Sequence, residues 1–161
     1  MTRTLQLLTF LMLLSGPLCH AQNLKAQKKY FPKAIKKMKV YLGSTEAQLL
    51  EKCPSCRNTG TQESFRRIYA VDFDDKQFEK AFFYVSKPKA ELYEMLLIAK
   101  EGQDPKEIAV ALLGSPNAEN EEWRFYPNDT GFSYTIAAWI FNNKLIIAGT
   151  LKGSEWETGL D

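Results

Sequence analysis

Apolar and polar positions along this 161-residue chain alternate with two different periods, which separates helical from extended segments. Residues 31–43, FPKAIKKMKVYLG, carry one apolar stripe at helical spacing, and Gly43 ends the pattern. A second helix is expected over residues 44–53. There Thr45 and Gln48, three positions apart, predict a capping box.

A third helix is predicted where DPKEIAVALLGSPN begins. Asp104 has the residue type preferred as an N-cap, and Pro105 suits the first helical position because its missing N–H needs no partner there. Glu107 is expected to close a capping box, and Gly114 followed by Pro116 is expected to stop the helix.

The remaining apolar segments predict strands. FRRIYAVDF (65–73) and FEKAFFYVS (78–86) flank the polar turn DDKQ. The stretch 90–100, AELYEMLLIAK, fits a helix or a strand, because apolar side chains occur on all its sides. A small domain rarely buries a helix all round, so the pattern favours a central strand.

The second half repeats this order. EEWRFYP (121–127) is expected to be a strand, and the strands 131–141 and 144–152 flank Asn142-Asn143, a two-residue hairpin turn. Such a turn places Phe141 opposite Lys144 and divides the hairpin's side chains between two faces.

Helix, strand, strand, strand therefore occurs twice, and we interpret the chain as a diverged tandem repeat. The predicted fold class is α+β: two similar helix-plus-antiparallel-meander repeats, with the helices packed on one face of the sheet. The expected organisation is a signal peptide (1–21), a Lys-rich leader (22–33), repeat 1 (34–101), repeat 2 (102–152) and a C-terminal tail (153–161).

The first 21 residues have the features of a secretory signal peptide. Arg3 precedes the apolar run LQLLTFLMLL, which is too short to span a bilayer, and small residues permit cleavage after Ala21. Pro17-Leu18 before Cys19 does not fit a lipoprotein signal. The mature protein is therefore expected to be secreted or periplasmic.

Cleavage would remove Arg3 and His20, the only histidine, which leaves 20 basic and 19 acidic residues. This balance predicts no nucleic-acid partner. Without imidazole, a Ser-His-Asp triad, a Cys-His pair and a His-ligated zinc ion are all excluded. We expect no cofactor and no metal, and Asp72, Asp74 and Asp75 lack the spacing of an EF-hand calcium loop.

Lysines crowd the start of the mature chain, with Lys25, Lys28 and Lys29 in the leader. They could contact an anionic surface weakly, or they could form the solvated face of the first helix. Asn128 begins an NDT glycosylation sequon, which would matter only in a eukaryotic secretory pathway.

Two segments carry a resemblance to a known family. GSTEAQLL, and KEIAVALLGSP followed by EEWRFY, resemble the β-lactamase-inhibitor-protein-like fold. That superfamily includes small lipoproteins of the outer-membrane protein assembly machinery. The resemblance covers roughly the last third of the chain and, more loosely, residues 33 to 60. It implies a secreted or periplasmic binding protein that holds a partner with its sheet or adjoining loops.

Cys53 and Cys56 form the motif CPSC. In thioredoxin-type enzymes the reactive cysteine begins a helix, whereas here the predicted helix ends at Cys53, where its dipole disfavours a thiolate. Zinc would need two further ligands. In an oxidising compartment the pair is expected to close a structural disulfide, and a thiol-disulfide oxidoreductase remains the alternative.

The last hairpin provides the candidate binding residues. One face of it is almost wholly apolar, and the other combines Trp139 and Phe141 with Thr135 and Lys144. Large aromatic side chains on a partly polar surface are typical of protein interfaces, so these four residues are the expected contact face for an extracytoplasmic protein partner. Alternatively, Trp139 packs beneath a loop or the C-terminal tail.

Overall fold

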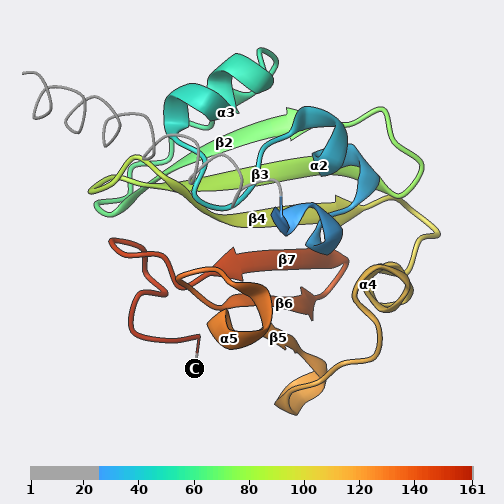
Figure 1. Ribbon diagram of the computed structural model, residues 1–161. Coiled ribbons are helices and arrows are strands. Elements are labelled where there is room, and N and C mark those ends of the chain that lie inside the picture. Colours follow the sequence, from blue (N-terminus) through green and yellow to red (C-terminus); the bar gives the residue numbers. More distant parts are fainter. Residues whose placement is uncertain (1–25, 161) are drawn as a thin grey trace, which may run out of the picture.

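The structure is a computed structural model that describes residues 26–160, and in this range it is an α+β fold built on one seven-stranded antiparallel sheet (Figure 1). The predicted signal peptide and Lys25 lie outside the described residues. None of the helices in residues 26–160 is long and apolar enough to cross a bilayer. The elements are η1 (Gln27–Tyr30), α2 (Lys33–Met38), α3 (Glu46–Lys52), β1 (Arg57–Asn58), β2 (Arg66–Asp72), β3 (Phe78–Ser86), β4 (Leu92–Ala99), α4 (Pro105–Leu113), η2 (Glu119–Glu121), β5 (Trp123–Phe125), α5 (Pro127–Thr130), β6 (Ile136–Phe141) and β7 (Lys144–Gly149).

The helix starts follow the predicted caps. Thr45 and Gln48 form the complete capping box of α3. At α4, the Asp104 side chain caps the helix but accepts its hydrogen bond from the Lys106 N–H, so the predicted box with Glu107 is not the bond that forms. Gly114 ends α4 with a positive φ of 84°.

The predicted helix over residues 31–43 is wrong in length. It ends at Met38, where Lys39 adopts a left-handed conformation. Residues 40–42 then run outside any helix with their side chains buried, and the Gly43 N–H donates to the Leu92 carbonyl at 2.7 Å. A bond to a distant strand therefore replaces the helical bond that residue 43 would otherwise make.

The sheet has the strand order β1-β2-β3-β4-β7-β6-β5. The ambiguous segment 90–100 is the central strand β4, which pairs with β3 and β7 and confirms the strand interpretation. The hairpin register is also confirmed, since Phe141 lies opposite Lys144 and Trp139 lies opposite Ile146.

Each half of the sheet is a meander preceded by a helix. In the first half α3 precedes β2-β3-β4, and in the second α4 precedes β5-β6-β7. The last strands of the two meanders, β4 and β7, pair antiparallel at the middle of the sheet. The halves differ in size, because β2 has seven residues and β5 has three. The tandem repeat thus stays a prediction.

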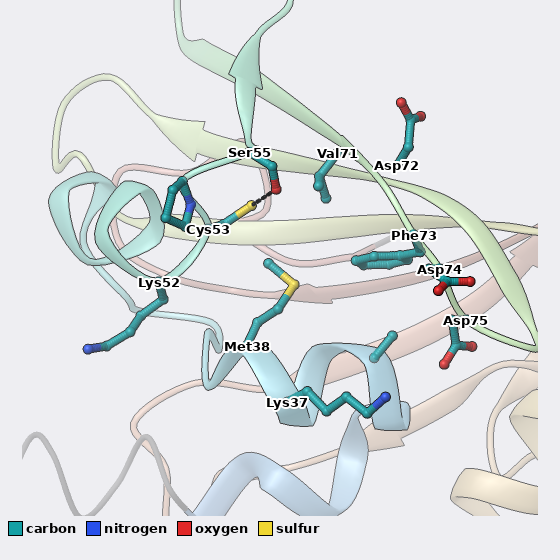
Figure 2. A pocket seen from close by; sticks show the side chains of 12 residues that line it. Lys37, Met38, Lys52, Cys53, Ser55, Val71, Asp72, Phe73, Asp74 and Asp75 are labelled. Carbon is teal, nitrogen blue, oxygen red and sulfur yellow. Dashed lines mark hydrogen bonds between the residues drawn. The ribbon is translucent and has the colours of Figure 1, made fainter.

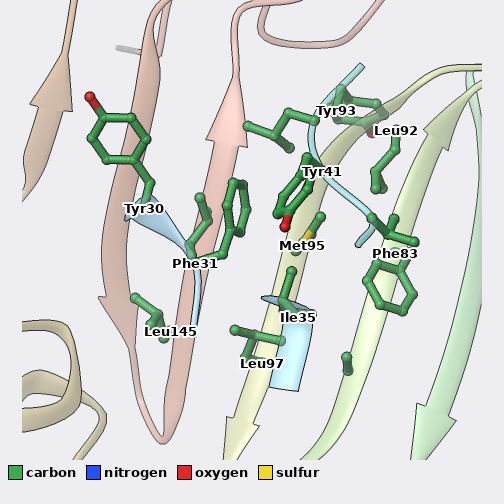
Figure 3. Packing of buried hydrophobic residues seen from close by; sticks show 14 of the residues in the cluster. Tyr30, Phe31, Ile35, Tyr41, Phe83, Leu92, Tyr93, Met95, Leu97 and Leu145 are labelled. Atoms are coloured by element: carbon green, nitrogen blue, oxygen red, sulfur yellow. The ribbon is translucent and has the colours of Figure 1, made fainter. Parts of the chain in front are cut away.

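The main core lies on the sheet face formed by Met95 and Leu97 of β4. Figure 3 shows Phe31, Ile35 and Tyr41, which come before the sheet in sequence, lying over these two side chains. On the same face, α3 is tied to β2 because Arg67 donates two hydrogen bonds to Glu46, at 2.6 and 2.7 Å.

Part of the predicted Lys-rich leader (22–33) contributes to this core. Gln27, Tyr30 and Phe31 are buried, and the Gln27 amide donates to the Leu42 carbonyl at 2.8 Å. Tyr30 also packs against Phe125, with ring centroids 4.5 Å apart. Residues 27–31 therefore belong to the folded domain, since removing them would uncover apolar side chains from both halves of the sheet.

Candidate functional site

The second face of the sheet, opposite the Met95 and Leu97 face, carries a continuous apolar row. Residues directly opposite each other in paired strands share a face, and the register aligns Phe82, Leu96, Ile146 and Trp139 across β3, β4, β7 and β6. Ile146 is buried, and the other three side chains are partly exposed.

The neighbouring row extends this surface toward solvent. It aligns Ile98, Lys144 and Phe141, of which Phe141 is the most exposed large apolar side chain in the described residues, at 56%. The Lys144 ammonium lies 5.3 Å from the centre of the Phe141 ring, which is a cation–π distance. We call Phe82, Leu96, Ile98, Trp139 and Phe141 the apolar stripe.

A third feature of the second face is the C-terminal segment 153–160, which we call the strap. The Trp156 indole N–H donates to the Glu94 carboxylate at 2.6 Å, and the Trp156 ring meets the Trp139 ring edge-on with centroids 5.8 Å apart. Trp139 therefore joins the apolar stripe to the strap: the C-terminal tail contacts Trp139, which nevertheless stays partly exposed.

Both ends of the strap are also tied to strands. Near its start, Glu155 accepts a hydrogen bond from Arg66 of β2 at 2.8 Å. Near its end, the Leu160 carbonyl accepts one from Arg124 of β5 at 3.1 Å. Because β2 and β5 lie on opposite sides of the sheet centre, the strap passes across several strands.

Glu94 is the buried carboxylate of this face, with a residue exposure of 6%. Burial raises its pKa to about 7, and the negative charge of Glu155 acts in the same direction. The Trp156 N–H and the positive charge of Arg66 oppose this increase without cancelling it. Glu94 is therefore a group that changes its charge near neutral pH while it contacts the strap.

The four candidate binding residues are only partly brought together. Phe141, Lys144 and Trp139 lie on adjoining rows of the second face. Thr135 precedes β6, and its N–H bonds to the Thr150 hydroxyl at 3.1 Å, beyond the row that the strap contacts. Thr135 is therefore separated from the apolar stripe by the row of the sheet that the strap contacts.

Sequence reasoning did not single out Phe82, Leu96, Ile98 or Glu94 as site residues. The alternation in segments 78–86 and 90–100 already places Phe82, Leu96 and Ile98 on one face of their strands. The pattern does not show that β4 pairs with β7, and this pairing brings the three side chains beside the last hairpin.

Cys53 and Cys56 form the predicted disulfide, and both residues are buried. Cys53 is the C-cap of α3, as the sequence indicates. Beside the disulfide lies a cleft whose lining includes Met38 and Phe73 (Figure 2). The Cys53 sulfur contacts the Ser55 hydroxyl at 3.9 Å, and Lys52 lies at the rim. The disulfide joins the C-terminal end of α3 to Cys56, the residue that precedes β1.

The aspartate-rich turn is occupied with local hydrogen bonds. Asp75 accepts from the backbone N–H groups of Gln77 and Phe78, and Asp72 pairs with Lys80 at 3.2 Å. Within residues 26–160, no three His, Cys, Asp or Glu side chains are grouped so that they could hold a metal ion.

Lys28 and Lys29 of the Lys-rich segment are exposed on η1, and Asn128 of the sequon is exposed on α5. Lys29 lies 4.8 Å from the centre of the Tyr30 ring. Both segments are accessible, and neither is part of the second face.

Comparisons of this chain with protein-family models, with characterised proteins and with solved structures found no match.

Proposed function

We propose that this chain is a secreted or periplasmic binding protein, without catalytic activity, that holds another extracytoplasmic protein through the second face of its sheet. The observation that carries the proposal is the apolar stripe, in which aromatic and aliphatic side chains on β3, β4 and β6 remain partly or largely exposed on either side of the buried Ile146 of β7. Contiguous exposed apolar surface of this kind is costly for a monomer and is typical of interaction sites.

The chemistry of the stripe favours a protein partner. Trp139 and Phe141 are the large aromatic anchors that dominate protein interfaces, and Lys144 beside Phe141 adds a charge at the margin. The Cys53–Cys56 disulfide supports an oxidising compartment, in agreement with the predicted signal peptide. The same proposal includes three expectations from the sequence: the resemblance to the β-lactamase-inhibitor-protein-like fold, the tandem repeat, and packing of every helix on one face of the sheet.

The test is affinity purification from the native envelope or medium, with three baits compared by quantitative mass spectrometry. Phe141→Ala removes an anchor of the stripe, and Tyr126→Ala is the matched control, because Tyr126 is 54% exposed and lies outside the stripe. Circular dichroism should show equal folding of all baits. The proposal requires a protein held by the wild type and by Tyr126→Ala but recovered at least about tenfold less with Phe141→Ala. Equal recovery on all three baits would refute it.

The alternative, a thiol-disulfide oxidoreductase, has less support. A redox enzyme needs an accessible sulfur whose thiolate is stabilised, whereas Cys53 is 3% exposed and caps the negative end of a helix. The neighbouring Lys52 would offset this dipole only in part. A binding role through the sheet requires neither an accessible sulfur nor a stabilised thiolate.

A further inference from the structure

The strap is attached to the sheet by side-chain contacts rather than by strand pairing. The backbone hydrogen bonds of residues 153–160 run to Leu151 or within the segment itself, as in Ser154 to Leu151 and Glu157 to Ser154. An element without ladder hydrogen bonds opens at a lower cost than a strand of the sheet, because few bonds must break.

The residues beneath the strap show what it covers. The register aligns Glu94, Ala148, Ala137 and Arg124 across β4, β7, β6 and β5. Glu94 and Arg124 bond to the strap, and the two alanines between them are fully buried. Small side chains in the middle of the row leave room for the strap to lie close to the sheet. Displacing the strap would therefore expose this row next to Trp139 of the apolar stripe.

We infer that residues 153–160 form a displaceable strap over the second face, and that Glu94 is its proton-sensitive clasp: the strap is closed when Glu94 is neutral and is released when Glu94 ionises. The strap regulates access to the face used in the proposed function, and its biological purpose rests on that function. The opening itself needs no partner.

The groups around Glu94 determine the direction of the effect. Arg66 faces it from β2, Tyr84 from β3, Tyr93 from its own strand, and Glu155 and Trp156 from the strap, while β7 and β6 contribute the uncharged Ala148 and Trp139. A neutral Glu94 can accept the Trp156 N–H and donate its own proton to Glu155. An ionised Glu94 lies buried beside a second carboxylate, which is unfavourable.

The size of the effect follows from linkage. In the closed state the pKa of Glu94 is about 7, and contact with water would return it toward the ordinary value of 4.5. A carboxyl with a raised pKa stabilises the closed state fully below pH 4.5 and loses this contribution as pH rises from 4.5 to about 7. The ratio of open to closed strap therefore increases by at most ~300-fold between acidic and alkaline pH.

The experiment uses the full chain labelled with 5-fluorotryptophan and followed by ¹⁹F NMR from pH 5 to pH 9. The wild type should show the Trp156 and Trp139 signals titrating together with a midpoint near 7. The H₂O-to-D₂O isotope shift of the Trp156 signal, which reports water contact, should grow above that midpoint. Trp123 is an internal reference, because it is fully buried with its N–H bonded to the Gly114 carbonyl at 2.8 Å.

Three variants complete the test. Glu94→Gln keeps an acceptor for the Trp156 N–H but cannot ionise, so both signals should stay at their low-pH positions. Glu46→Gln changes a carboxylate that bonds to Arg67 on the other face, and it should titrate like the wild type. Trp156→Phe removes the indole N–H that Glu94 accepts, so the Trp139 signal should move toward its high-pH position even at pH 5. This variant tests the clasp independently if Glu94→Gln does not fold.

The inference is overturned if the Trp156 isotope shift is the same at pH 5 and pH 9, or if the titration persists in Glu94→Gln. Neither result would affect the bait comparison of Phe141→Ala with Tyr126→Ala. Conversely, failure of the bait comparison would leave the pH-dependent opening intact.

Discussion

Removing the disulfide tests whether the CPSC motif is a structural crosslink. The perturbation is the double variant Cys53→Ala and Cys56→Ala. The bond joins residues only three positions apart, so it closes a four-residue ring. The chain-entropy relation gives such a ring about 2 kcal/mol of stabilisation at 25 °C. Both residues are buried beside Met38 and Phe73, so replacing sulfur by hydrogen should add a small packing loss.

The assay is urea unfolding of the oxidised wild type, the reduced wild type and the double variant. The free energy of unfolding should fall by about 2 kcal/mol in both altered forms, with an unchanged dependence on urea concentration. Agreement between the reduced wild type and the variant shows that the loss comes from the bond itself rather than from the substituted side chains.

A redox titration of the wild type provides the decisive comparison with an enzyme. A structural disulfide of this kind should have a reduction potential below about −300 mV. A potential between about −120 and −270 mV, the range of known oxidoreductases, together with unchanged stability in the double variant, would refute the crosslink interpretation and favour the oxidoreductase.

Three further predictions concern the fold. Leu97→Ala removes a fully buried side chain and should lower the free energy of unfolding by about 2–5 kcal/mol, whereas Leu50→Ala, at a position 40% exposed, should change it by less than about 0.5 kcal/mol. Thr45→Ala should cost about 1 kcal/mol in urea unfolding, because it removes the side-chain half of the α3 capping box. The pKa of Glu94 is raised from 4.5 to about 7, so wild-type stability should decline by up to about 3 kcal/mol as pH rises across this window, and Glu94→Gln should lack this decline in chemical unfolding at pH 5 and pH 8.5.

Local signals in the sequence predicted elements whose cause is itself local. Thr45 and Asp104 cap the helices that they were expected to cap, because a cap needs only the next few backbone N–H groups. The Asn142-Asn143 turn gave the correct hairpin register for the same reason, since a two-residue loop leaves one pairing. The helix over residues 31–43 was too long because a bond from Gly43 to β4, distant in sequence, replaced its last turn.

The candidate site was predicted in part. Alternation placed Trp139, Phe141 and Lys144 on one face of the hairpin, and the structure brings them together. Alternation also placed Thr135 on this face. It could not show that a row of the sheet contacted by the strap lies between Thr135 and the other three residues. The role of the C-terminal tail was left open, because no periodic pattern in GSEWETGLD indicates which surface it contacts.

By itself the sequence determined the order of the main helices and strands, the pairing within the last hairpin and the position of the disulfide at a helix end, because these depend mostly on neighbours within a few residues. The tertiary structure decided the pairing of β4 with β7, the continuity of the apolar stripe and the burial of Glu94 beneath the strap. These features join segments roughly 45 to 60 residues apart, and no periodicity along the chain shows which distant segments are buried together.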